Sequence, residues 1–152
     1  MSRFLCLWSC IFSLGIFAEE KPIVVIVPSY NNILWYQKNL DSVVAQTYSN
    51  YRVIYIDDCS TDGTGAAVMD YIKQRNLHDK IVFVQNYTRR GAMYNHYQGA
   101  HACPDHAIVV TVDGDDWFPD GDTKLLDRVN AAYQDLNVWM TYGQFQEHPT
   151  GG

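Results

Sequence analysis

The stretch Ile23-Val-Val-Ile-Val27 is a continuous run of β-branched residues that ends at Pro28. A run of this kind, without polar alternation, is typical of a strand that is buried on both faces of a parallel sheet. It therefore predicts a strand at the centre of an α/β domain.

Apolar strands alternate with amphipathic segments along the rest of the chain. Further strands are predicted at 52–56, 81–84 and 107–112, and helices at 33–46, 66–75, 91–102 and 124–134. A fifth strand is expected at 138–142. This alternation predicts right-handed crossovers and a parallel sheet that is covered by helices on both faces.

The composition favours a single globular domain. The 152 residues are 47% hydrophobic and carry a net charge of −6. This length is enough for one domain with its own core. The negative charge argues against general binding to nucleic acid, which requires a basic face.

Residues 1–20 are interpreted as a signal peptide or a short membrane anchor and are separated from the domain at 21–152. The run from Phe4 to Ala18 is uncharged and mostly apolar, and it is shorter than the roughly 20 residues of a spanning helix. This leader predicts a secretory-lumen, exported or membrane-associated protein rather than a cytoplasmic one. Of the cysteines, Cys59 and Cys103 lie in the domain, and the sequence leaves open whether they form a disulfide.

An acidic turn, Asp113-Gly-Asp115-Asp116, directly follows the predicted strand at 107–112. Carboxylates this close repel one another, and a hard divalent cation such as Mg²⁺ or Mn²⁺ relieves that repulsion. A cation at this position is suited to hold a diphosphate. The competing interpretation is a solvated acidic turn before a helix.

Polar residues follow each of the first four predicted strands, at 28–32, 57–58, 86–90 and 113–116. Ligands of parallel sheets bind at the carboxyl ends of the strands, so these loops predict one shared site. His96, on the third predicted helix, is assigned to the core or the surface rather than to this site. No dinucleotide GxGxxG fingerprint follows the first strand, and no P-loop motif occurs.

Four segments together resemble one family. They are Ile23–Asn31, Gln46–Tyr48, Tyr55–Gly63 and Val112–Pro119, in this order. The combination resembles the family 2 glycosyltransferases with the GT-A fold over about residues 22–142. The resemblance implies a Rossmann-like α/β sheet, parallel or mixed, and transfer of a sugar from a nucleotide-diphosphate donor, a UDP-sugar by expectation, with inversion.

The resemblance also implies roles for individual residues. The nucleotide-binding set is Pro28, Ser29, Tyr30, Asn31, Asp57, Asp58, Arg90, Asn95, Asp113 and Gly114. Within it, either Asp57 or Asp58 is expected to contact the base. Mn²⁺ or Mg²⁺ is expected to bind Asp115, with Asp113 and Asp116 as further candidates.

The family places its catalytic base downstream of the acidic turn, and the resemblance therefore predicts a base beyond Gly152 and a domain that is incomplete at its carboxyl terminus. The acceptor is an unspecified glycan, lipid or protein. The alternative hypothesis is a catalytically silent module that binds the nucleotide sugar without transferring it.

Overall fold

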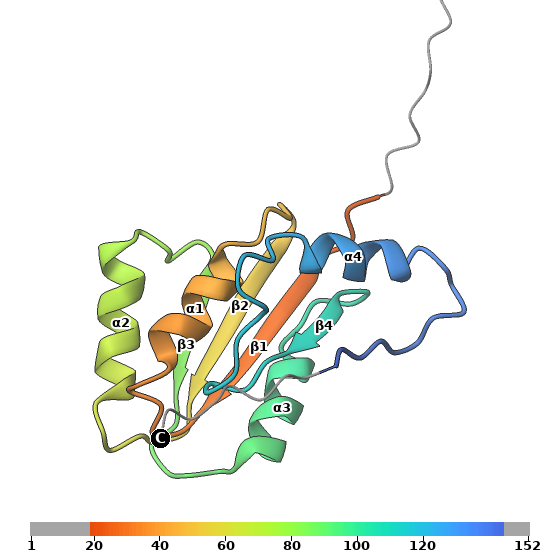
Figure 1. Ribbon diagram of the computed structural model, residues 1–152. Coiled ribbons are helices and arrows are strands. Elements are labelled where there is room, and N and C mark those ends of the chain that lie inside the picture. Colours follow the sequence, from red (N-terminus) through yellow and green to blue (C-terminus); the bar gives the residue numbers. More distant parts are fainter. Residues whose placement is uncertain (1–18, 145–152) are drawn as a thin grey trace, which may run out of the picture.

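The computed structural model describes residues 19–144, which build a four-stranded sheet in the order β3-β2-β1-β4 (Figure 1). The strands are β1 (Ile23–Ser29), β2 (Tyr51–Asp57), β3 (Ile81–Gln85) and β4 (Ile108–Thr111). All three strand pairings are parallel. The predicted α/β fold with a parallel sheet is confirmed.

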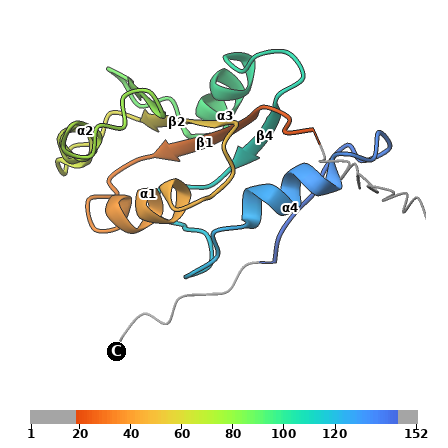
Figure 2. The same ribbon diagram turned by 90° about the horizontal axis from the view of Figure 1, so that it is seen from above.

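The helices cover both faces of this sheet, as predicted. They are α1 (Tyr36–Val44), α2 (Thr64–Gln74), α3 (Ala92–His101) and α4 (Leu125–Ala132). Figure 2 shows α1 and α4 on one side of the sheet and α3 on the other. The buried side chains of α2 join the same core cluster as those of α1 and α4.

Every residue of β1 is buried, which explains its unbroken apolar sequence. Val25 and Val27 join the larger core under α1, α2 and α4, whereas Val24 and Ile26 lie in a smaller cluster on the α3 side. Burying each of these side chains contributes about 1.5–3 kcal/mol. On the α3 side Gly99 permits close approach, because a Cβ there would lie 2.7 Å from Ile26 Cγ2.

The strand β1 continues through Pro28 to Ser29, two residues further than the sequence predicted. The carbonyl of Pro28 accepts a hydrogen bond from the Gly114 amide, on the β4 side of the strand. The N–H and C=O of one strand residue point to the same side, so the N–H that proline lacks would also have pointed toward β4. The paired ladder with β4 has already ended at Ile26. Proline therefore costs the sheet little at this position.

The predicted fifth strand at 138–142 is wrong. These residues form neither helix nor strand, and the side chains of Trp139 and Tyr142 are each 90% exposed. Strand propensity largely reflects packing against neighbouring strands, and no strand within residues 19–144 pairs with this segment.

The predicted leader at 1–20 lies almost wholly outside the described residues, so the structure does not test it. Within residues 19–144, no helix is long and apolar enough to cross a bilayer. Cys59 and Cys103 are both free thiols.

Candidate functional site

Hydrogen bonds between side chains and main-chain amides join the loops that follow β1 and β2 at the carboxyl end of the sheet. The Asn31 amide N–H donates to Ser60 Oγ, and Asn31 Oδ1 accepts from the Thr61 N–H, each over 2.9 Å. The Asn32 N–H donates to Thr64 Oγ1 over 2.9 Å. Asn31 has a φ of 55°, a left-handed conformation that asparagine tolerates better than most residues. These bonds fix the path of both loops.

Asp62, which was not among the predicted site residues, strengthens the same junction. Its carboxylate accepts hydrogen bonds from the Ile33 N–H, the Thr64 N–H and the Thr64 hydroxyl. Burial acts to raise the pKa of Asp62, but the bonds from Thr64 and Ile33 outweigh it and the pKa is lowered. Asp62 therefore stays ionised and holds the start of α2 beside the loop after β1.

Asp58 ties the loop after β3 to the end of β2. Its side chain is buried, and one oxygen accepts from the Arg90 N–H and from Asn86 Nδ2 while the other accepts from the Gly91 N–H, all within 2.7–2.8 Å. Burial alone would raise the pKa of Asp58, and these hydrogen bonds lower it. Both carboxylate oxygens are already engaged, so Asp58 acts first as an anchor of the loop.

Four buried side-chain atoms have no hydrogen-bond partner within residues 19–144. They are Asn39 Oδ1, Asp57 Oδ1, Asn95 Nδ2 and His96 Nδ1. All four residues flank the carboxyl end of the sheet, because Asp57 ends β2 and the others lie in the amino-terminal halves of α1 and α3. Unpaired buried polar groups are uncommon, and their concentration here is typical of a site for a ligand or ordered water.

Gly114 presses the acidic turn against the loop after β1. A Cβ at this position would lie 2.5 Å from Asn32 Nδ2 and 2.7 Å from Ser29 Oγ. Hydrogen bonds restrain both neighbours, because Ser29 Oγ accepts from Asn32 Nδ2 over 3.1 Å and from the Tyr55 hydroxyl over 2.9 Å. The Gly114 N–H donates to the Pro28 carbonyl over 2.9 Å. The turn is therefore held in contact with the loop by a main-chain bond and by close packing at Gly114.

The three carboxylates of the turn, Asp113, Asp115 and Asp116, are exposed at the surface. The pKa of Asp116 is raised by partial desolvation and by the neighbouring charges of Asp115 and Asp113. Within residues 19–144 no three metal-binding side chains are arranged as a ready-made ion site. Mg²⁺ and related ions are usually bound by one or two carboxylates together with substrate phosphates, and this donor set fits such an ion.

His96 belongs to the site, contrary to its assignment to the core or the surface. Its Nε2 lies 3.5 Å from Asp113 Oδ1, and its side chain is 30% exposed. The available signal was its position: the first turns of a helix that follows a strand lie close to the strand ends. Asn39 was likewise missed, since nothing in the sequence set it apart from other helical asparagines.

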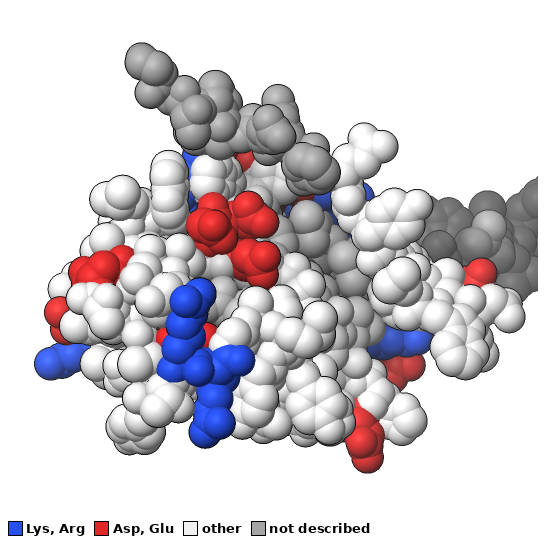
Figure 3. All heavy atoms as spheres, turned by 90° about the horizontal axis from the view of Figure 1, so that it is seen from below, with Lys and Arg blue, Asp and Glu red and all other residues white. Residues whose placement is uncertain are grey.

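Basic and aromatic side chains line the site on the side of β3. The Arg89 guanidinium lies over the Tyr30 ring at 4.0 Å, and that of Arg90 is 5.3 Å from the Tyr94 ring. Figure 3 shows a group of acidic side chains beside a group of basic ones on this face. Arg90 was predicted here, whereas Arg89, which contacts the predicted residue Tyr30, was not.

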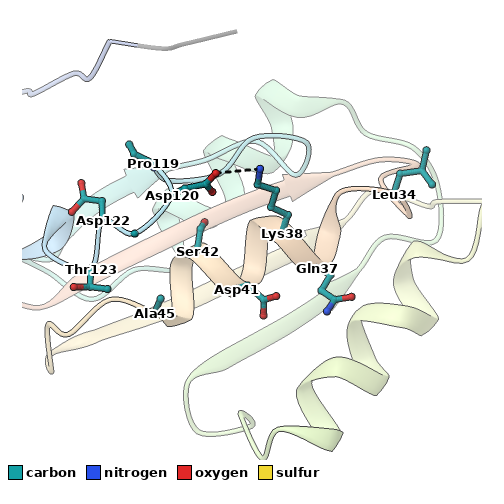
Figure 4. Close-up of a pocket in the computed structure, with 11 residues that line it drawn as sticks. Leu34, Gln37, Lys38, Asp41, Ser42, Ala45, Pro119, Asp120, Asp122 and Thr123 are labelled. Atoms are coloured by element: carbon teal, nitrogen blue, oxygen red, sulfur yellow. Dashed lines mark ion pairs between the residues drawn. The ribbon is translucent and has the colours of Figure 1, made fainter. Parts of the chain in front are cut away.

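A separate pocket of about 450 Å³ lies between α1 and the loop at 119–123 (Figure 4). Its charged groups on α1 already have partners in the protein: Asp41 accepts from Arg75 and Tyr71, and Lys38 pairs with Asp120 at 3.6 Å. The buried polar atoms that lack a hydrogen-bond partner belong to residues at the strand ends. None of these residues lines the pocket between α1 and the loop at 119–123. The strand-end loops are therefore the better candidate.

The family model described as "Glycosyl transferase family 2" matches residues 24–149 of the chain. The chain belongs to glycosyltransferase family 2. The family 2 resemblance that the sequence motifs indicated is thus confirmed.

Individual glycosyltransferases are similar to this family 2 chain in sequence and fold. Glycosyltransferase GlyA of Streptococcus pneumoniae is 28% identical over 133 residues, which cover 84% of this chain and 18% of GlyA. S. aureus TarS in complex with UDP-GlcNAc superposes with a TM-score of 0.63 at 26% identity, over 74% of this chain and 31% of that one.

The mannosyltransferase PcManGT from Pyrobaculum calidifontis, in complex with GDP-Man and Mn²⁺, also has a TM-score of 0.63. It is 29% identical, over 74% of this chain and 32% of that one. The family 2 chain described here thus spans less than a third of GlyA and about a third of each of the two structural neighbours.

Proposed function

We propose that this chain binds a nucleoside-diphosphate sugar at the carboxyl end of its sheet and transfers the sugar to an acceptor hydroxyl. The observation that carries the proposal is the acidic turn, held by Gly114 against Ser29 and Asn32 beside a cluster of unpartnered buried atoms. Two structural neighbours support it, since their structures contain UDP-GlcNAc and GDP-Man with Mn²⁺.

The proposed donor lies across the loops that follow the four strands. The nucleoside is bound between the loops after β1 and β3, where Tyr30 and Arg89 form one wall and Asp57 and Asn95 present unpartnered atoms. Because Asp58 is engaged by the loop after β3, Asp57 is the better of the two candidates for a direct contact to the base. A UDP-sugar is the proposed donor.

The diphosphate is placed at the acidic turn. Asp115 is the proposed metal ligand, with Asp113 and Asp116 beside it. When bound there, Mn²⁺ or Mg²⁺ neutralises the charge that develops on the leaving diphosphate. The turn contributes rigidity, because Asn39 fixes the main-chain carbonyls of Asp113 and Asp116 at 3.0 Å and 2.7 Å.

Inversion at the sugar requires a base that removes the proton of the attacking acceptor hydroxyl. The three carboxylates of the turn are assigned to the metal and the donor, and Asp58 and Asp62 are occupied by backbone amides. We therefore place the base outside the loops described here, and the acceptor is a glycan, lipid or protein hydroxyl.

A proton NMR assay of the chain with UDP-glucose or UDP-N-acetylglucosamine and Mn²⁺ tests this function. With methanol added as the acceptor, release of UDP together with a methyl β-glycoside from an α-linked donor is the expected result, because a glycoside, unlike a free sugar, does not mutarotate. Formation of the methyl α-glycoside would contradict inversion. Tight, Mn²⁺-dependent binding without any release would instead support the silent nucleotide-sugar-binding module. Absence of binding to every nucleoside diphosphate would refute the donor site itself.

A further inference from the structure

Asp113 is contacted from both faces of the sheet. Asn39 of α1 donates to its main-chain carbonyl over 3.0 Å, and His96 of α3 lies 3.5 Å from its carboxylate. The helices α1 and α3 lie on opposite sides of the sheet (Figure 2). Different elements thus contact the backbone and the side chain of Asp113.

The Asp113 carboxylate needs such a contact to keep one orientation. Its side chain is 56% exposed, and an exposed aspartate samples several rotamers when nothing restrains it. Asn39 restrains only the main chain, which leaves the carboxylate free to rotate. His96 is the neighbour that can restrain it.

His96 faces Asp113 through its Nε2. Its Nδ1 is buried and has no partner within residues 19–144, so Nε2 is the ring nitrogen that engages another residue. Nε2 carries a proton in one neutral tautomer and in the imidazolium, and in either form it can donate to Asp113. The separation of 3.5 Å exceeds an ordinary hydrogen bond of about 2.7–3.2 Å, so the contact has room to shorten when a donor binds.

We propose that His96 is a positioning residue, whose Nε2–H orients the Asp113 carboxylate for metal-dependent binding of the donor diphosphate. This inference rests on the proposed function. Residues that orient a metal-binding carboxylate usually change metal-dependent affinity without contacting the ligand. A residue that merely joins α3 to the turn would change stability instead.

Calorimetry with UDP in Mn²⁺ and in EDTA separates the two roles. We expect His96→Leu to weaken binding about 10- to 100-fold in Mn²⁺ and to leave binding in EDTA unchanged. His96→Gln, which keeps an amide donor close to the position of Nε2, should retain most of the Mn²⁺-dependent affinity. His101→Leu, an exposed histidine of the same helix, is the matched control and should bind as the wild type does.

Equal weakening of His96→Leu in both conditions, or no weakening, would overturn the proposal. If His96→Leu fails to fold, the UDP affinity of His96→Gln and the ring ¹⁵N signals of His96 in the wild type still test the proposal. Asp113→Asn should shift the Nε2 signal and Asp115→Asn should not, and equal responses would overturn the contact. If the wild type binds no UDP in Mn²⁺, the proposed function fails, whereas the ¹⁵N signals still test whether His96 engages Asp113.

Discussion

The side-chain amide of Asn39 donates a 2.7 Å hydrogen bond to the main-chain carbonyl of Asp116, which lies 77 residues later in the chain. The same Nδ2 donates to the carbonyl of Asp113 over 3.0 Å. Asn39 is fully buried, and both bonds are partly shielded from solvent. The shape of the acidic turn therefore depends on a residue of the first helix.

Replacement of Asn39 by alanine should lower the free energy of unfolding by about 2–4 kcal/mol, because two partly buried carbonyls lose their donor. Urea denaturation measures this change. Gln98→Ala, at an exposed position of α3, should stay within about 0.5 kcal/mol of the wild type. Equal stability of the two variants would show that the Asn39 bonds do not support the turn.

Alanine at Gly114 should destabilise the protein by about 1–3 kcal/mol, since its Cβ would overlap Asn32 and Ser29. The displaced turn should also weaken UDP binding in Mn²⁺. Gly143→Ala provides the control, because nothing lies within 4 Å of a Cβ there. A stable Gly114→Ala variant with unchanged UDP affinity would contradict the close contact between the turn and the loop after β1.

Asp58 predicts a specific dependence of stability on pH. Its pKa is lowered in the folded protein, so its contribution to stability is present above the unfolded pKa near 3.8 and is lost as the pH falls through the folded value. Asp58→Asn cannot accept all three bonds, and we expect a loss of about 2–3 kcal/mol at pH 7.

Urea titrations of Asp58→Asn at pH 7 and pH 3 measure this effect. The difference between the variant and the wild type should shrink at the lower pH, because the unfolded wild type binds a proton at Asp58 there and the stabilisation from the ionised carboxylate decreases. Asp70→Asn, at an exposed position of α2, should follow the wild type at both values. A deficit for Asp58→Asn that is identical at both pH values would exclude a role for the ionised carboxylate.

The leader predicted at residues 1–20 gives a test of localisation. Fusion of these residues to a reporter enzyme should direct the reporter out of the cytosol. A reporter from which these residues have been deleted should remain in the cytosol. Recovery of the intact fusion in membranes would favour an anchor, whereas recovery of a shortened, soluble reporter would favour a cleaved signal peptide. A soluble, full-length cytosolic fusion would contradict both.

Much of the fold could be predicted because β1 is buried on both faces, so its burial appears directly as a β-branched run. The segment at 138–142 also has a strand-like composition, but Trp139 and Tyr142 are exposed. Composition does not show whether a neighbouring strand exists. Pro28 was expected to end β1, yet the strand continues since the paired ladder with β4 stops earlier.

Those parts of the candidate site whose position follows from the order of strands and loops along the chain could be predicted. The polar loops follow the strands, and parallel strands bring those loops to one edge. Side-chain direction was not predictable: Asn39 and His96 reach the acidic turn only because of how α1 and α3 pack. The same limit explains why Arg90 was chosen although Arg89 lies over Tyr30.

Binding of UDP to Asp115→Ala and to the wild type, each with Mn²⁺ and with EDTA, tests the proposed donor site most directly. We expect the wild type to bind UDP more tightly with Mn²⁺ and the variant to bind with the same weak affinity in both conditions. Asp120 is an exposed aspartate that follows the acidic turn in the chain, and Asp120→Ala should bind UDP as the wild type does. Mn²⁺-dependent binding that survives Asp115→Ala unchanged would contradict the assignment of the acidic turn as the diphosphate and metal site.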